Sequence, residues 1–348
     1  QAPPFLGTER SFANAHESGT GRFFVDSKDQ DQKWILKGFN DYWDKNTGNV
    51  DEIVLSPIKD GASRVSALLS GNVDWIQPVP PQDYDRITKN KGAQLITTSG
   101  TRIITLQLNQ KRRTEFKDPR VRLAIVHAVN NEGIVEKIMK GRAVAAAQNS
   151  PVGYAGHVEE LKPRFNIEKA RVLMKEAGQD KGFAVSMIAP NNRYANDEKI
   201  AESVVAMLAK INIRVDLKTM PKEPYWEAFD TQKADIQMIG WHCEMEDSAD
   251  FFESLYMCPS KDTGYGQFNS GNYCNQKVDE LTLSSQSETD PEKRAKILQQ
   301  VERILYEEAA YVPLHWQALA WAGSKKIKNA SEIVNPANLS YFDDLIME

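Results

Sequence analysis

Short apolar runs separated by glycine and polar turns fill the first hundred residues and predict β-strands. The first three runs follow one another closely, in the order strand, turn, strand, turn, strand, which is typical of an antiparallel meander. A short helical pattern over 63–69 ends at Gly71. The predicted strands lie at residues 19–25, 34–37, 53–55, 73–76, 94–96 and 103–109.

After residue 109 the apolar positions change to helical spacing, with strand-like runs between the helices. Asp118 and Pro119 form a helix start signal, and Gly178 follows a later helix as its C-cap. Helices are predicted at 118–128, 134–141, 166–177, 198–211, 225–229 and 291–308. Strands are predicted at 183–188, 213–217, 236–239, 311–316 and 318–322. This alternation indicates an α/β fold.

The stretch 235–250 is the first candidate for a functional site. A buried strand over 236–239 breaks at Gly240 into a loop that holds Trp241 and several carboxylates. A strand that ends in a polar loop is the usual place for a binding site on an α/β scaffold. A solvated acidic turn is the alternative, but a large aromatic beside carboxylates favours a pocket.

Composition and charge narrow the class of protein. The chain has 348 residues, of which 41% are hydrophobic and 26% charged, so it is long enough for two globular lobes. The net charge of −5, without a basic cluster, argues against a nucleic-acid partner. The sequence has no nucleophile elbow, zinc-protease helix or phosphate loop, so we expect no enzyme, cofactor or catalytic residue.

The three cysteines leave two readings open. Cys258 and Cys274 flank a turn-rich segment that can close a loop, whereas Cys243 lies in the acidic loop. Reduced thiols suit an intracellular protein, and a Cys258–Cys274 disulfide suits an exported one.

Several short motifs follow one another along the chain. They lie at Gly19–Phe23, Asn40–Trp43, Ala67–Asp74, Leu108–Arg122, Glu168–Gly178 and Gly240–Asp247. Taken together and in order, these segments resemble the motifs of the extracytoplasmic solute-binding proteins that serve peptide and nickel ABC transporters. Arg22 stands where the family usually has proline in its first motif, and the similarity runs from about residue 19 to the end.

The resemblance implies a two-lobed periplasmic-binding-protein fold of the cluster C type. Residues 1–107 would form part of lobe I, 108–314 the α/β ligand-binding lobe II, and 315–348 the return to lobe I. The N-terminal part of lobe I and its extra subdomain would be missing from this chain. Because the family is exported, the resemblance also implies the Cys258–Cys274 disulfide.

The function that the resemblance implies is that of a receptor for an ABC importer. Such a receptor captures a peptide or peptide-like solute in the interlobe cleft and delivers it to the membrane permease. We expect a periplasmic or extracytoplasmic monomer, attached to the membrane only through the transporter or an N-terminal lipid anchor absent from this chain. The alternatives are a receptor for an opine, sugar or metal chelate, and a non-transport interaction protein.

The family motifs assign candidate ligand contacts in the acidic loop. Glu244 takes the place of an aspartate that pairs with the ligand's α-ammonium group in peptide-binding relatives, and its side chain is one methylene longer. Asp247 matches the second aspartate of the motif, and Trp241 its tryptophan. His242 and Cys243 carry metal-binding atoms, but adjacent residues seldom point to one ion, so no metal is predicted.

A second group of candidates follows the strand over 183–188. Peptide binders of the family often have Arg-Pro-Tyr there, and the arginine holds a carboxylate. Tyr194 matches the tyrosine, Asn192 takes the arginine position, and Arg193 is one residue out of register. A guanidinium is the natural bidentate partner of a carboxylate. Trp226 falls near an aromatic residue that lines the family's cleft, with core packing as the alternative.

Overall fold

The structure is a computed structural model that describes residues 19–29, 33–45, 47–243 and 247–348. The chain divides into two compact units. Unit 1 contains the residues up to Thr98 and those from Leu319 on, and unit 2 contains Ser99–Ala318. The lobe boundaries expected after residues 107 and 314 stay a prediction.

Unit 1 contains the predicted meander. Strands β1 (Phe23–Asp29), β2 (Lys33–Gly38) and β3 (Glu52–Leu55) form an antiparallel sheet in the order β1-β2-β3. Helix α2 (Gly61–Leu69) begins at Asp60, whose carboxylate accepts a hydrogen bond from the Ser63 amide. Unit 1 also contains β4 (Trp75–Ile76) and α3 (Tyr84–Thr88).

A larger sheet has the strand order β4-β10-β5-β9-β7-β8, with β6 (Val144–Ala145) beside β10. Strand β7 (Ala184–Pro190) lies parallel to both β8 (Arg214–Met220) and β9 (Ile236–Trp241). Strand β5 (Ala93–Leu108) pairs with β9 in the antiparallel sense. The division between the units falls within β5 and within β10 (Val312–Ser324).

The prediction of separate strands at 94–96 and 103–109, and at 311–316 and 318–322, was wrong. Each pair is one continuous strand, β5 or β10. Residues 97–102 between the two predicted strands are mostly polar, and all but Gly100 lie at partly or fully exposed positions of β5, where a strand continues through polar side chains. A strand is interrupted by proline or turn chemistry rather than by polarity alone.

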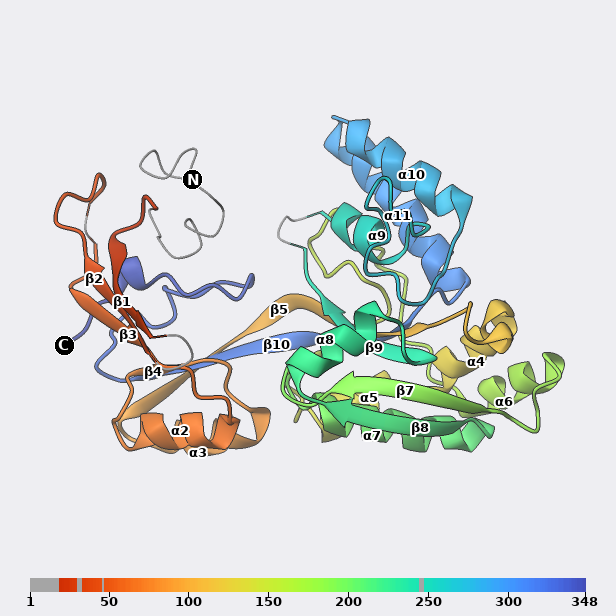
Figure 1. The fold of residues 1–348 in the computed structure, drawn as a ribbon, viewed down its shortest axis with the longest axis horizontal. Helices are drawn as coiled ribbons and strands as arrows, with labels where there is room; N and C mark the ends of the chain where they lie inside the picture. Colours follow the sequence, from red (N-terminus) through yellow and green to blue (C-terminus); the bar gives the residue numbers. More distant parts are fainter. Residues whose placement is uncertain (1–18, 30–32, 46, 244–246) are drawn as a thin grey trace. The chain divides into compact units, whose positions relative to one another are not determined.

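Helices cover both faces of the sheet in unit 2, which confirms the α/β fold (Figure 1). Side chains alternate between the faces along β5, so Ile104 and Leu106 pack on one side and Ile103 on the other. The first face packs against α4 (Pro119–Ala128), α5 (Asn131–Lys137), α6 (Ile167–Glu176) and α7 (Asp197–Leu208). The second packs against α8 (Lys222–Asp230), α9 (Ala249–Leu255), α10 (Gln276–Ser287) and α11 (Pro291–Glu307). None of the helices among the described residues is long and apolar enough to cross a membrane.

The structure confirms the helix start predicted at Asp118 and the helix end predicted at Gly178. The Asp118 carboxylate accepts a hydrogen bond from the Arg120 amide at 2.8 Å, and Gly178 has the positive φ of 69° that a C-cap glycine supplies. Helices α9 and α10 were not predicted. The short α9 begins inside the acidic stretch, but its residues Phe251 and Phe252 are fully buried, so packing decides its conformation.

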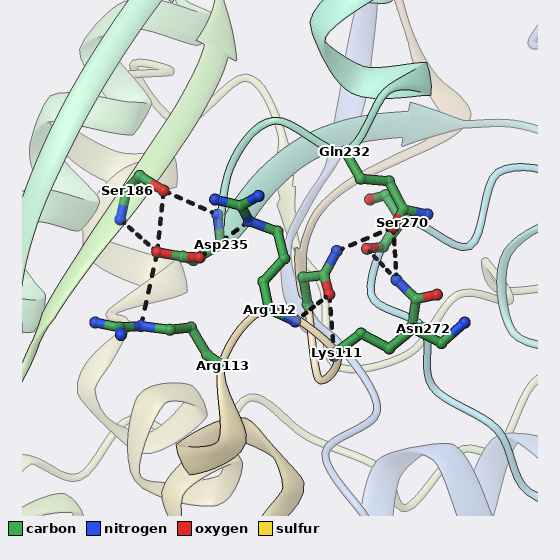
Figure 2. A network of polar contacts seen from close by, with 9 residues as sticks. Lys111, Arg112, Arg113, Ser186, Gln232, Asp235, Ser270 and Asn272 are labelled. Atoms are coloured by element: carbon green, nitrogen blue, oxygen red, sulfur yellow. Dashed lines mark hydrogen bonds and ion pairs between the residues drawn. The ribbon is translucent and has the colours of Figure 1, made fainter.

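A network of hydrogen bonds and ion pairs lies at the end of the unit 2 sheet where β5 ends and β9 begins (Figure 2). The Asp235 carboxylate accepts hydrogen bonds from Arg112 Nε at 3.1 Å and from the Ser186 amide at 2.9 Å. Arg113 Nε lies 3.7 Å from the same carboxylate. Asp235 therefore joins the segment after β5 to β7 and to the start of β9.

The disulfide between Cys258 and Cys274 is confirmed. The two residues are 16 positions apart in the sequence, and their Cα atoms are 4.5 Å apart. Cys243 is free and buried. The disulfide closes the turn-rich segment between α9 and α10.

We expect one reactive thiol per chain when the oxidised protein is titrated in denaturant, because only Cys243 is unbridged. Replacing Cys258 and Cys274 by serine should lower the free energy of unfolding by about 3 kcal/mol, the chain-entropy value for a loop of this size. The control Cys243→Ser should remove the reactive thiol and leave the disulfide intact. Three reactive thiols in the oxidised protein would contradict the pairing.

His315 is an unusual core residue. Its side chain lies in β10 opposite Ala145 and is 1% exposed. Neither ring nitrogen has a hydrogen-bond partner among the described residues. Burial lowers the pKa of His315 to about 4, because a charged imidazolium would lose its hydration there.

This lowered pKa predicts loss of stability in acid. The unfolded chain, with a histidine pKa near 6.5, binds a proton between pH 6.5 and 4 that the folded chain excludes. The contribution of His315 to the free energy of unfolding is fully present above pH 6.5. It decreases by about 3 kcal/mol as the pH falls to 4. His315→Leu should reduce the difference in unfolding free energy between pH 7 and pH 4.5, measured by urea denaturation. An unchanged difference would assign the acid sensitivity to other groups.

Candidate ligand-binding site

The predicted site segments meet at one edge of the unit 2 sheet. Strands β7 and β9 are parallel, so the residues after Pro190 and after Trp241 leave the sheet at the same edge. Strand β5 is antiparallel to β9, and its Ile103 pairs with Trp241. The structure thus brings the two candidate segments together, at the carboxyl ends of parallel strands where α/β folds bind ligands.

Tyr194 fits against Gly240 at this edge. The tyrosine is 6% exposed, and its hydroxyl accepts a hydrogen bond from the Gly240 amide at 2.8 Å. A Cβ atom at position 240 would lie 2.7 Å from Tyr194 Cε1 and 2.6 Å from Ile104 Cδ1. Only glycine therefore leaves room for the tyrosine ring. Burial raises the pKa of Tyr194, which keeps its hydroxyl neutral.

Arg193 lies in the same turn as Tyr194, and part of its guanidinium has no hydrogen-bond partner among the described residues. Its guanidinium carbon lies 5.1 Å from the centroid of the Tyr194 ring. Its Nε atom is buried, and no described residue accepts a hydrogen bond from it. A buried donor without an acceptor has lost its hydrogen bond to water. This loss lowers the stability of the folded protein unless a ligand supplies the acceptor.

Arg102 approaches the same place from β5. Its Nη1 atom donates a hydrogen bond to the Gly240 carbonyl oxygen at 3.3 Å. Burial lowers the pKa of Arg102, and the positive charge of Arg193 lowers it further. The sequence reading missed Arg102, because a single arginine in a strand gives no signal by itself.

Asp197 positions the turn that carries Arg193 and Tyr194. Its Oδ2 atom accepts hydrogen bonds from the amides of both residues at 2.9 Å, and Oδ1 accepts one from the Glu198 amide at 3.0 Å. Burial raises the pKa of Asp197, and the three amide donors oppose that shift. The carboxylate is thus used on the backbone rather than on the guanidinium of Arg193.

Asn192 lies on the exposed side of this turn. Its Oδ1 atom accepts a hydrogen bond from the Lys222 amide at 2.8 Å, which joins the turn to the start of α8. On α8, Trp226 is partly buried and packs edge to face against Phe229, with ring centroids 5.4 Å apart. Asn192 therefore joins two elements of unit 2, whereas Trp226 contacts its own helix and packs against the second apolar core.

Trp241 is held on two sides. Its indole Nε1 donates a hydrogen bond to Asp250 Oδ2 at 2.8 Å, and its ring centroid lies 4.7 Å from that of Phe268. Cys243 is buried nearby, and its pKa is raised by burial and by the charge of Asp250. Asp250 was not singled out by sequence, although it belongs to the acidic stretch.

Asp247 is engaged within the chain. Its Oδ2 atom accepts a hydrogen bond from Arg294 Nε at 2.6 Å, and its Oδ1 atom accepts one from the Ala249 amide at 2.8 Å. The ion pair raises the pKa of Arg294. Glu244 and Glu246 lie outside the described residues, so the predicted ligand contact of Glu244 stays a prediction. No group of three or more histidine, cysteine or acidic residues among the described ones is arranged to hold a metal ion.

The fold is similar to that of two-lobed periplasmic binding proteins. The peptide-bound periplasmic protein DppA of Helicobacter pylori superimposes with a TM-score of 0.85 at 23% identity, over 98% of this chain and 67% of that one. The agropinic acid complex of AgaA from A. tumefacien R10 superimposes with a TM-score of 0.79 at 26% identity, over 93% of this chain and 64% of that one.

The family model of bacterial extracellular solute-binding proteins, family 5, middle part, matches residues 3–263. The chain belongs to this family, which confirms the resemblance and an extracytoplasmic location. It is 25% identical to the dipeptide-binding protein of Escherichia coli (strain K12) over 335 residues, which is 95% of this chain. It is 25% identical to the glutathione-binding protein GsiB of Salmonella paratyphi A over 320 residues, which is 90% of this chain. The chain spans 61% of the length of each of these relatives.

The close contact at Gly240 predicts the effect of a single methyl group. Gly240→Ala should lower the free energy of unfolding by about 1–3 kcal/mol, because Tyr194 and Ile104 must both move. The control Gly21→Ala, at a position with no atom within 4 Å of the added Cβ, should change it by less than about 0.5 kcal/mol. Equal effects in urea denaturation would contradict the packing of Tyr194 on Gly240.

Proposed function

We propose that this chain is the ligand-binding part of a receptor that captures a peptide or peptide-like solute and delivers it to the permease of an ABC importer. The observation that carries the proposal is the Arg193 guanidinium, whose buried Nε lacks an acceptor among the described residues. A ligand carboxylate provides two oxygens in the plane that a guanidinium requires. Family membership supports a receptor rather than an enzyme, and we assign no catalytic step.

In this proposal Arg193 binds the ligand's carboxylate, and Tyr194 supplies the apolar wall beside it. Trp241, held by Asp250 and Phe268, offers a rigid aromatic surface to the rest of the ligand. Glu244 pairs with the ligand's ammonium group.

Three further residues belong to the proposed site. Asn192 and Asp247 fix the loops through their contacts within the chain, and Trp226 borders the site from α8. We propose that the protein acts as a monomer and reaches the membrane through its transporter or a lipid anchor. A carboxylate-bearing opine is the second candidate ligand, since the solved structure of AgaA holds agropinic acid.

The proposal is tested by the ligand itself. Small molecules released from the purified full-length protein should include a peptide or peptide-like compound when analysed by mass spectrometry. Release of an opine would favour the second candidate. Release of a sugar, together with no binding of peptides in calorimetry, would contradict the proposal.

We expect Arg193→Gln to weaken peptide binding by roughly 30-fold or more, since losing one partner of a buried ion pair costs on the order of 2–5 kcal/mol. Titration calorimetry with alanyl-glutamine measures the loss. The matched control Arg214→Gln changes an exposed arginine of β8 and should alter the affinity by less than about twofold. Equal losses in both variants would point to a general effect of charge rather than a contact with the ligand.

A further inference from the structure

Two guanidinium groups converge on Gly240 from opposite sides of β9. Arg102 belongs to β5, and Arg193 follows β7; these strands are the two neighbours of β9 in the sheet. Arg102 donates to the Gly240 carbonyl oxygen at 3.3 Å, whereas Arg193 lies over the ring of Tyr194, which is itself hydrogen-bonded to Gly240. Both side chains are partly buried and therefore open to solvent on one side.

No carboxylate forms an ion pair with either arginine among the residues that the structure describes. The nearest acidic group on the turn, Asp197, accepts its hydrogen bonds from backbone amides. Two other arginines of unit 2 have partners: Arg294 pairs with Asp247 at 2.6 Å, and the Arg122 guanidinium donates to carbonyl oxygens that directly follow α11 and that precede α4. Among the described residues, the pair at Gly240 is thus a concentration of positive charge without a carboxylate partner.

Like charges held together in a partly desolvated place repel each other and destabilise the unliganded protein. A bound anion removes that repulsion and supplies the missing acceptors. One carboxylate satisfies one guanidinium in the bidentate geometry, so two guanidiniums from separate segments correspond to two carboxylates.

We propose that Arg102 and Arg193 together form a subsite for a ligand with two carboxylates, such as a peptide that ends in an acidic residue. This inference rests on the proposed function and narrows it from peptides in general to acidic ones. Arg193 binds the carboxylate that every peptide carries at its C-terminus. Arg102 binds the second carboxylate and so determines the preference for acidic ligands.

The test compares alanyl-glutamate with its uncharged analogue alanyl-glutamine in titration calorimetry on the full chain. The wild-type protein should bind the acidic peptide at least tenfold more tightly. Arg102→Gln should reduce that preference to within about twofold while leaving the affinity for alanyl-glutamine nearly unchanged. Arg102→Lys should keep part of the preference, and Arg193→Gln should weaken both peptides.

The outcomes separate this inference from the proposed function. Binding of both peptides with equal affinity by the wild type, or equal losses of both in Arg102→Gln, would overturn the acidic subsite and leave the peptide receptor standing. Binding of neither peptide would overturn both. Competition by inorganic phosphate but not by glutarate would assign the arginine pair to a phosphoryl group and overturn the dicarboxylate.

The melting temperature of unliganded Arg102→Gln should equal or exceed that of the wild type, because the repulsion between the two arginines is removed. A large decrease would mark Arg102 as a structural residue and count against the subsite.

Discussion

The antiparallel pairing of β5 with β9 is the constraint on which the candidate site depends. In its register Ile104 lies opposite Gly240, and Ile103 lies opposite Trp241. Because successive side chains of a strand point to opposite faces, a slip by one residue would exchange the two apolar cores of unit 2. The same pairing brings Arg102 beside the carbonyl group of Gly240. The geometry of the site is therefore fixed by the packing of the sheet rather than by its loops.

From this pairing a chain of contacts leads to Arg193. Gly240 leaves space for Tyr194 and binds its hydroxyl, and Asp197 accepts hydrogen bonds from the amides of Tyr194 and Arg193. The position of the guanidinium is thus determined by groups that are themselves buried and hydrogen-bonded. Such preorganisation reduces the ordering that a ligand must impose when it binds.

Most of the correct predictions came from short-range sequence patterns. The cap at Asp118, the C-cap at Gly178 and the disulfide each depend on short stretches of sequence or on the family motif. The placement of Tyr194 beside the end of β9 could also be expected, since parallel strands end at one edge of a sheet. The unbroken length of β5 could not, because polar residues within a strand resemble a turn when their exposure is unknown.

What the sequence could not show are contacts between distant residues. Glu302 of α11 is fully buried, and its carboxylate accepts hydrogen bonds from the Asn149 amide at 3.0 Å and from Ser150 Oγ at 2.9 Å. These partners lie more than 150 positions away, and no local pattern marks Glu302 as different from the exposed acids of the same helix. Arg102 was not predicted for the same reason, because its proposed role depends on Gly240 and Arg193, which are distant in the sequence.

The charged residues that hold unit 2 together differ from those at the candidate site in having partners among the described residues. Asp235 and Asp247 each hold arginines that join elements of unit 2, and Glu302 receives donors from a distant loop. Among the described residues these three carboxylates have partners, whereas Arg102 and Arg193 have no carboxylate partner. Unbalanced charge in a partly buried place lowers the stability of the free protein, and natural sequences retain such local conflicts mainly where function requires them. We therefore propose that the chain accepts lower stability at the edge of the sheet around Gly240 because ligand binding requires it.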